Sequence, residues 1–160
     1  MHIPSGSELL NPVSLLERAG IREGWRVADL GCGTGYFIIP AARIIGQNGL
    51  AYGVDILKSA LAATESRARL ENVRNIKLVW SDLDVPGATK IKEASLDLAM
   101  LINNRVHETM IQEAIRLLKS GGNLLVIDWK TTATPFGPQA AERVSAEEAK
   151  VKAKKYGLFS

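Results

Sequence analysis

The stretch "VADLGCGTGYF", residues 27–37, carries three glycines at alternate positions between two apolar runs. Gly31, Gly33 and Gly35 follow a short run typical of a buried strand, and a helical pattern begins after them. A glycine permits a sharp turn out of a strand, and a backbone without Cβ lets a ligand approach closely. The stretch therefore predicts a strand, a ligand-binding loop and a helix in succession.

Strand-like and helical segments alternate along the rest of the chain. Five nearly continuous apolar runs are typical of strands covered on both faces of a parallel sheet: 25–30, 50–56, 76–82, 96–102 and 123–129. Between and after them, helical periodicity and cap signals predict helices at 12–19, 36–45, from 57 onward, at 106–119, and from 145 to a stop at 157. This alternation predicts a doubly wound α/β sheet.

Composition and charge argue against a disordered chain, a coiled coil and a nucleic-acid-binding protein. The chain is 46% hydrophobic and 23% charged, as is ordinary for a globular domain. The net charge is +3, and residues 141–160 contribute five basic against three acidic side chains. We interpret these as the solvated face of a helix, so no nucleic-acid ligand is expected.

The cysteine count and the N-terminus indicate the compartment. Cys32 is the only cysteine, which excludes an intrachain disulfide and a cysteine metal cage, and no metal site is predicted. The N-terminus lacks the basic start and apolar stretch of a signal peptide, and no run of about 18 apolar residues predicts a membrane span. A cytoplasmic location is expected.

Carboxylates stand at the ends of the first three predicted strands, at Asp29, Asp55 and Asp82. Any one of them taken alone is better explained by the preference of Asp for caps and turns. Ligands of open α/β sheets, however, bind outside the carboxyl ends of the strands. Three carboxylates beside a glycine loop therefore predict a ligand site, in which Asp55 suits the paired hydroxyls of a ribose, and the ligand would be a nucleoside.

Two other nucleotide-binding patterns fit less well. The dinucleotide fingerprint needs a small residue at position 36, where this chain has Tyr36. The phosphate-cradling P-loop needs a Gly-Lys-Ser or Gly-Lys-Thr, which does not follow the glycines. A nicotinamide-dependent oxidoreductase is thus a weaker alternative.

The stretch at 27–37 resembles the first motif of the class I S-adenosylmethionine-dependent methyltransferases, in which an acidic residue precedes alternating glycines. Later segments resemble that family in the same order: "YGVDI", "WSDL", "LDLAMLINN" and "GGNLLVIDW". The likeness extends over residues 11–159 and is greatest to the small-molecule branch that includes the quinone-biosynthesis C-methyltransferases. It implies a Rossmann-like, mainly parallel sheet of strand order 3-2-1-4-5, S-adenosylmethionine as cofactor, and methyl transfer to an acceptor expected to be a small molecule.

The resemblance also implies which residues hold the methionine end of the cofactor. Asp29 and the loop glycines Gly31, Gly33 and Gly35 would bind the methionine portion. Asn103, at the end of the fourth predicted strand, would contact it through the main chain.

At the adenosine end, the resemblance implies four further positions. Asp55 would accept hydrogen bonds from the ribose hydroxyls, and Ile56 would pack on the adenine. Asp82 would accept a hydrogen bond from the exocyclic amine of adenine, beside the main chain of Leu83.

No catalytic residue is assigned, because a sulfonium methyl group is already electrophilic and a base is needed only if the acceptor must lose a proton. His107 is a candidate base, but a surface position explains it as well. Cys32 is interpreted as a small residue that fits between glycines. Trp25, Trp80 and Trp129 are expected in the core or the pocket wall.

We expect one domain over residues 1–160: a helical segment at 1–24, a cofactor-binding core at 25–129, and a loop with a helix at 130–160.

The chain departs from the family at its C-terminal end. Family members usually continue into two more strands, which the pattern of residues 1–160 does not predict. We therefore expect the fifth strand to be an open edge, where a second copy or another partner would pair. Two interpretations stay open: these residues are a truncated form of a longer protein, or a partner covers the exposed edge.

Three segments are expected to hold the acceptor: 1–10, 103–108 and 130–140. They are short and do not identify it. A second alternative therefore stays open, a non-catalytic cofactor-binding module that acts through a partner at the open edge.

Overall fold

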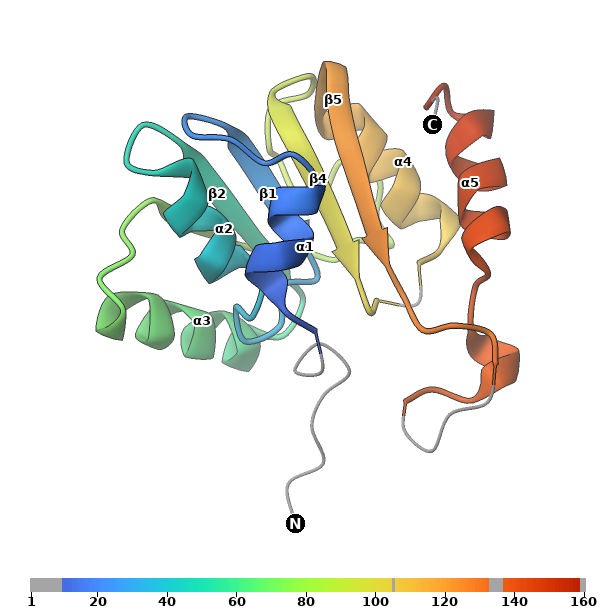
Figure 1. The fold of residues 1–160 in the computed structure, drawn as a ribbon, viewed down its shortest axis with the longest axis horizontal. Coiled ribbons are helices and arrows are strands. Elements are labelled where there is room, and N and C mark those ends of the chain that lie inside the picture. Colours follow the sequence, from blue (N-terminus) through green and yellow to red (C-terminus); the bar gives the residue numbers. More distant parts are fainter. Residues whose placement is uncertain (1–9, 105, 133–136, 159–160) are drawn as a thin grey trace.

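Five parallel strands form one sheet in the order β3-β2-β1-β4-β5 (Figure 1). This computed structural model describes residues 10–104, 106–132 and 137–158. The strands are β1 (Arg26–Leu30), β2 (Leu50–Asp55), β3 (Ile76–Trp80), β4 (Leu96–Ile102) and β5 (Leu118–Ile127). The predicted fold class and strand order are confirmed.

Helices cover both faces of the sheet. They are α1 (Pro12–Arg18), α2 (Ile38–Ile45), α3 (Lys58–Leu70), α4 (Glu108–Leu117) and α5 (Ala146–Lys155), with a short 3-10 helix η2 (Ala140–Glu142) before α5. Helices α1, α2 and α3 pack into the core on one face, and α4 packs on the other face with α5 beside it (Figure 1).

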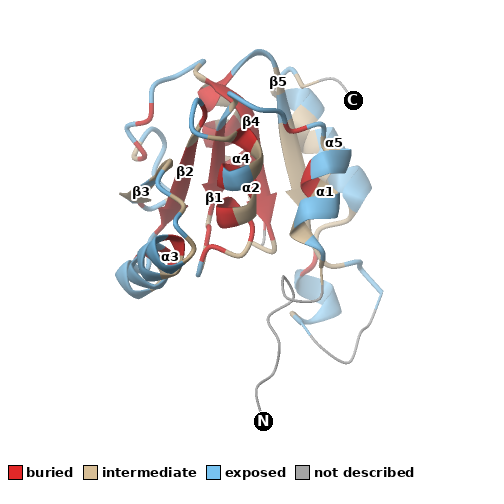
Figure 2. Cartoon of the chain, turned by 60° about the vertical axis from the view of Figure 1, so that its left-hand side comes forward, coloured by how far each residue is buried: buried red, intermediate tan, exposed pale blue. Residues whose placement is uncertain are grey.

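The central strands are buried because both of their faces are covered. Figure 2 shows β4 coloured as buried, and all seven of its residues are buried. In β1 the side chains of Val27 and Ala28 belong to the cores on opposite faces. This double coverage explains why the strands are continuous apolar runs rather than alternating patterns.

Local signals set the helix ends as the sequence predicts. The Asn11 side chain accepts a hydrogen bond from the Ser14 N–H at 3.1 Å at the start of α1. Ser145 and Glu148 form a capping box at the start of α5. These caps satisfy N–H groups that have no partner within the helix.

The α4–β5 connection differs from the prediction. The helix was expected over 106–119, but it ends at Leu117, and β5 begins directly at Leu118. Leu118 is buried and pairs with Leu96, and the chain then bulges before Asn123 pairs with Leu98. Two factors favour the strand over a longer helix. Leu118 is buried when it pairs with β4, and the serine and glycines that follow it are poor helix formers.

Strand β5 is an edge of the sheet, since it pairs only with β4 among the described residues. Its last four residues are half-buried. No sixth strand occurs in the described part of the chain. Of the segments expected to hold the acceptor, residues 1–9, 105 and 133–136 lie outside the described residues.

Candidate functional site

The glycine loop after β1 is held by main-chain hydrogen bonds to the neighbouring strand. The N–H groups of Gly31 and Cys32 both donate to the Val54 carbonyl, at 2.8 and 2.9 Å. The Gly33 N–H donates to the Asp55 carboxylate at 2.9 Å, and the Thr64 hydroxyl donates to the Gly33 carbonyl at 2.9 Å. Strand β2 and helix α3 thus fix the loop at the carboxyl edge of the sheet.

The loop glycines serve different physical purposes. All three have positive φ, which L side chains rarely adopt. A Cβ at Gly31 would overlap the Asn104 amide, and a Cβ at Gly35 would press on Thr64 and Ile39. Gly33 has open space around it. The absent side chain at Gly35 therefore allows the loop to pack on α2 and α3, whereas Gly33 leaves its backbone accessible.

Asp29 lies buried at the end of β1, directly below the loop. Its side chain is 2% exposed, and Oδ1 has no hydrogen-bond partner among the described residues. Burial, with a further contribution from the nearby Asp55, raises the pKa of Asp29 to about 7. A buried acceptor without a partner is costly, so this atom fits a ligand that supplies a donor or a positive charge.

Two more buried polar atoms at this edge have no partner among the described residues, Ser81 Oγ and Asn103 Nδ2. They follow β3 and β4 respectively. Asn103 has a positive φ, and its N–H donates to the Ile127 carbonyl at 2.8 Å. Unsatisfied groups at the ends of three strands indicate one polar binding region rather than three separate defects.

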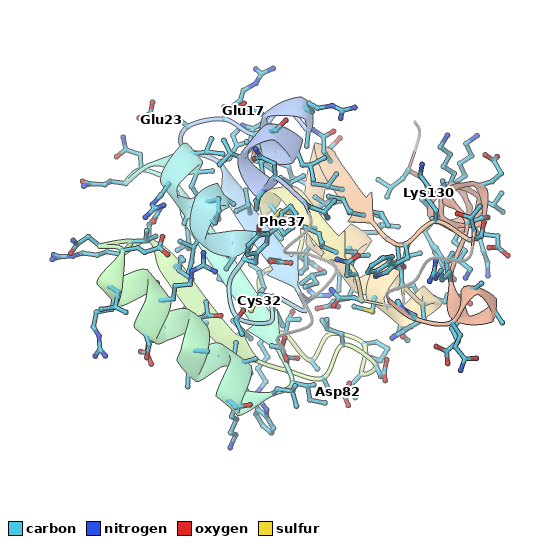
Figure 3. The ribbon with its side chains drawn as sticks, turned by 60° about the horizontal axis from the view of Figure 1, so that its bottom comes forward. Glu17, Glu23, Cys32, Phe37, Asp82 and Lys130 are labelled. Atoms are coloured by element: carbon cyan, nitrogen blue, oxygen red, sulfur yellow. The ribbon has the colours of Figure 1, made fainter. Side chains whose placement is uncertain are left out.

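A pocket of about 220 Å³ opens at this edge. It brings together five of the nine predicted site residues: Gly31, Asp55, Ile56, Asp82 and Leu83. It also contains residues that the sequence analysis did not assign to the cofactor: Ser81, Asp84, Asn104, His107 and Met110. Figure 3 looks toward this edge, with Cys32 in the central loop and Asp82 and Lys130 on different sides of it.

The Asp55 carboxylate is the best-supported acceptor in the pocket. Besides the Gly33 N–H, it accepts the Leu57 N–H at 2.8 Å. Asp55 is 8% exposed, and each of its oxygens can accept a further hydrogen bond. Asp82, by contrast, is exposed, and its side chain accepts the Asp84 N–H at 2.9 Å in a turn.

Asn104 lines the pocket, whereas the sequence analysis placed it only within the acceptor segment 103–108 and gave it no role of its own. Its side-chain amide donates to the carbonyls of Leu30 and Gly31, at 2.6 and 3.4 Å. It therefore lies across the first loop glycine and joins the end of β4 to the loop. The doubled asparagine after the fourth predicted strand was the available signal, but the sequence does not tell which of the two reaches the loop.

His107 is engaged through both of its ring nitrogens. Nε2 lies 2.8 Å from the Asp84 carboxylate, and Nδ1 lies 2.7 Å from the Thr109 hydroxyl. A general base needs a free nitrogen directed at its substrate. In this arrangement His107 instead connects the loop after β3 to the start of α4 across the pocket.

Cys32 is buried in the loop at 6% exposure. Burial, with Asp29 and Asp55 nearby, raises the pKa of its thiol. A protonated thiol is a weak nucleophile, in agreement with its interpretation as a small residue between glycines.

A buried ion pair anchors the segment between β3 and β4 that carries Asp82. Glu113 of α4 is 2% exposed, and it accepts hydrogen bonds from Arg116, the Thr89 hydroxyl and the Gly87 N–H. Burial opposes ionisation of Glu113, but these donors outweigh it and lower its pKa. The position of this side of the pocket thus depends on α4.

The described residues contain no cluster of three or more His, Cys, Asp or Glu side chains able to hold a metal ion. No described helix is long and apolar enough to span a membrane.

Comparison with known proteins gives a family match over most of the chain. The family model described as "Methyltransferase domain" matches residues 21–157. The ubiquinone/menaquinone biosynthesis C-methyltransferase UbiE of Pseudomonas entomophila is 30% identical over 81% of this chain and 52% of its own length. The aklanonic acid methyltransferase DauC of Streptomyces sp. (strain C5) is 36% identical over 48% of this chain and 34% of its own length. The chain thus spans about half, or less, of these curated relatives.

The same fold occurs in solved structures. A SAM-dependent methyltransferase from Aquifex aeolicus superimposes with a TM-score of 0.84 at 22% identity, over 98% of this chain and 84% of that one. This likeness establishes the fold.

Proposed function

Because the chain belongs to the methyltransferase domain family, we propose that it binds S-adenosylmethionine at the carboxyl edge of its sheet and transfers the methyl group to a small molecule. The observation that carries the proposal is Asp29, a buried carboxyl below a glycine loop, one of whose oxygens has no hydrogen-bond partner among the described residues. A cationic ligand fits this position, because it stabilises the ionised carboxylate that burial otherwise disfavours. Asn103 Nδ2 and Ser81 Oγ, which also lack partners within the part of the chain that the structure describes, add further polar atoms at the same edge.

At the methionine end, Asp29 would hold the cofactor together with the accessible backbone at Gly33 and the main chain of Asn103. The loop glycines Gly31 and Gly35 would act mainly by allowing Asn104 and α3 to pack against the loop. S-adenosylmethionine supplies an electrophilic methyl group on a sulfonium.

At the adenosine end, Asp55 would accept the ribose hydroxyls while it keeps its hydrogen bonds to the loop. Ile56 would offer an apolar surface to the adenine, and Asp82 would accept its amine beside Leu83. These residues position the cofactor, and positioning the acceptor in line with the methyl group supplies much of the acceleration.

The names of the relatives support a small-molecule acceptor. UbiE is named for the biosynthesis of quinones and DauC for aklanonic acid, and both kinds of compound are small molecules.

Strand β5 supports the expectation of a second copy or another partner at this edge, because an edge strand whose residues are only half-buried can pair with another chain. Sedimentation of the purified chain would test this expectation.

The test of the proposed function is calorimetric titration with S-adenosylmethionine and S-adenosylhomocysteine, with NADH as the control ligand. We expect micromolar binding of the first two, lost in Asp55→Ala and kept in Glu147→Gln, which removes one exposed acidic charge from α5. Binding of NADH alone would support the oxidoreductase alternative. Cofactor binding without methyl transfer to any acceptor in a screen would support the non-catalytic module.

A further inference from the structure

Trp80 stands at the carboxyl end of β3, an edge strand, and is 61% exposed. The sequence analysis expected it in the core or the pocket wall, and the structure corrects this expectation. A tryptophan left this exposed buries little apolar area, so its contribution to the core does not explain its position.

Two contacts hold the indole in place. Its only donor, Nε1–H, donates to the main-chain carbonyl of Ile56 at 2.8 Å. On the ring face, the Lys58 ammonium lies 4.7 Å from the ring centroid. The indole therefore bridges β3 to the turn between β2 and α3.

That turn and the last residue of β2 before it supply two of the residues proposed to hold the adenosine. Ile56 is 52% exposed and lines the pocket, and Asp55 precedes it. The turn is also held by the bond from the Leu57 N–H to the Asp55 carboxylate and by the Ser81 N–H, which donates to the Asp55 carbonyl at 3.1 Å. The indole is the one side chain described as donating to the Ile56 carbonyl.

We propose that Trp80 is a positioning residue for the adenosine half of the cofactor. It fixes the Ile56 main chain so that the Ile56 side chain and the Asp55 carboxylate are already placed when the ligand arrives. A preformed site loses less conformational entropy on binding, so release of this turn weakens affinity without removing any contact to the ligand. This inference rests on the proposed function.

The test compares Trp80→Phe with wild type. Phenylalanine keeps an aromatic ring for Lys58 but cannot donate to the Ile56 carbonyl. We expect the affinity for S-adenosylhomocysteine to fall about tenfold, the scale of one lost hydrogen bond. The affinity for adenosine, measured by displacement, should fall by the same factor, because the disturbed turn belongs to the half that both ligands share.

Lys58→Met is the matched control. It removes the cation from the ring and leaves the indole N–H in place, so its affinities should stay within about twofold of wild type. Because Trp80 is mostly exposed, Trp80→Phe should leave the melting temperature of the unliganded protein within about 2 °C of wild type. A larger fall would indicate a structural residue and overturn the proposal.

A double-mutant cycle with Ile56→Ala decides whether Trp80 acts through Ile56. If it does, the double variant loses less affinity for S-adenosylhomocysteine than the product of the two single losses, because Ile56→Ala already removes one of the two side chains that Trp80 places. Fully multiplicative losses would overturn the proposal, as would wild-type affinity in Trp80→Phe or a loss confined to S-adenosylhomocysteine. Wild-type protein that binds neither ligand would overturn the proposed function, and this inference with it.

Discussion

Replacing Asp29 with asparagine is expected to make the protein more stable and less able to bind its cofactor. Burial raises the pKa of this carboxyl from 3.8 to about 7 in the folded chain. Between these two pH values the unfolded chain ionises Asp29 while the folded chain keeps it protonated. The folded state then binds more protons, so stability falls as pH rises across this interval.

The cost is fully present above pH 7. A shift of about 3 pH units at about 1.4 kcal/mol per unit gives about 4 kcal/mol, an upper value because solvent that enters the site reduces it. Asp29→Asn removes this titration. We therefore expect its unfolding free energy, relative to wild type, to increase by up to about 4 kcal/mol between pH 4 and pH 8.

Urea denaturation of both proteins at several pH values measures this difference. Asp97→Asn is the matched control: Asp97 is also buried, at 9% exposure, but it accepts the Arg26 N–H and pairs with Lys119. Its substitution should destabilise the protein. A difference between Asp29→Asn and wild type that does not change with pH would refute the reasoning, as would undiminished binding of S-adenosylhomocysteine by the variant.

Three further substitutions have defined consequences. Gly31→Ala should cost about 2 kcal/mol or more and abolish cofactor binding in calorimetry, because it combines a positive φ with overlap on Asn104. Glu113→Ala should lower the free energy of unfolding in urea by about 3 kcal/mol, since it leaves Arg116 without its carboxylate. Arg143→Met should make the loop after β5 more sensitive to limited proteolysis, because this buried guanidinium donates to three main-chain carbonyls there, with about 1–3 kcal/mol lost. Cofactor binding by Gly31→Ala, wild-type stability in Glu113→Ala, or wild-type protease resistance in Arg143→Met would contradict the corresponding prediction.

The sheet was predictable because its signals are local. Continuous apolar runs mark strands covered on both faces, and glycines and caps mark the boundaries, so the strands and most helix ends agree with the sequence analysis. The strand order also agrees, but it was implied by the resemblance to the methyltransferase family and not by local signals. The end of α4 was not predictable in this way. Burial of Leu118 against a strand twenty-two residues earlier along the chain decides it, and no local pattern contains that contact.

The site was predictable by residue type more than by geometry. The sequence analysis placed Asp29, Asp55 and the loop glycines at one edge, and the structure brings them together there. It could not assign a role to Asn104, whose amide reaches the loop only because β4 lies beside β1. Nor could it predict that Trp80 lies outside the core, because whether a residue of an edge strand is buried depends on three-dimensional packing.

The two ends of the sheet differ in a way that locates the function. At the amino end, Asp97 is buried and receives both a main-chain donor and a lysine. At the carboxyl end, Asp29 is buried more deeply and keeps an oxygen without a partner among the described residues. A sequence under pressure for stability alone would pair or replace such a group. Under the proposed function, this carboxyl persists because a cationic ligand binds it, and the cost carried by the free protein then becomes affinity for that ligand.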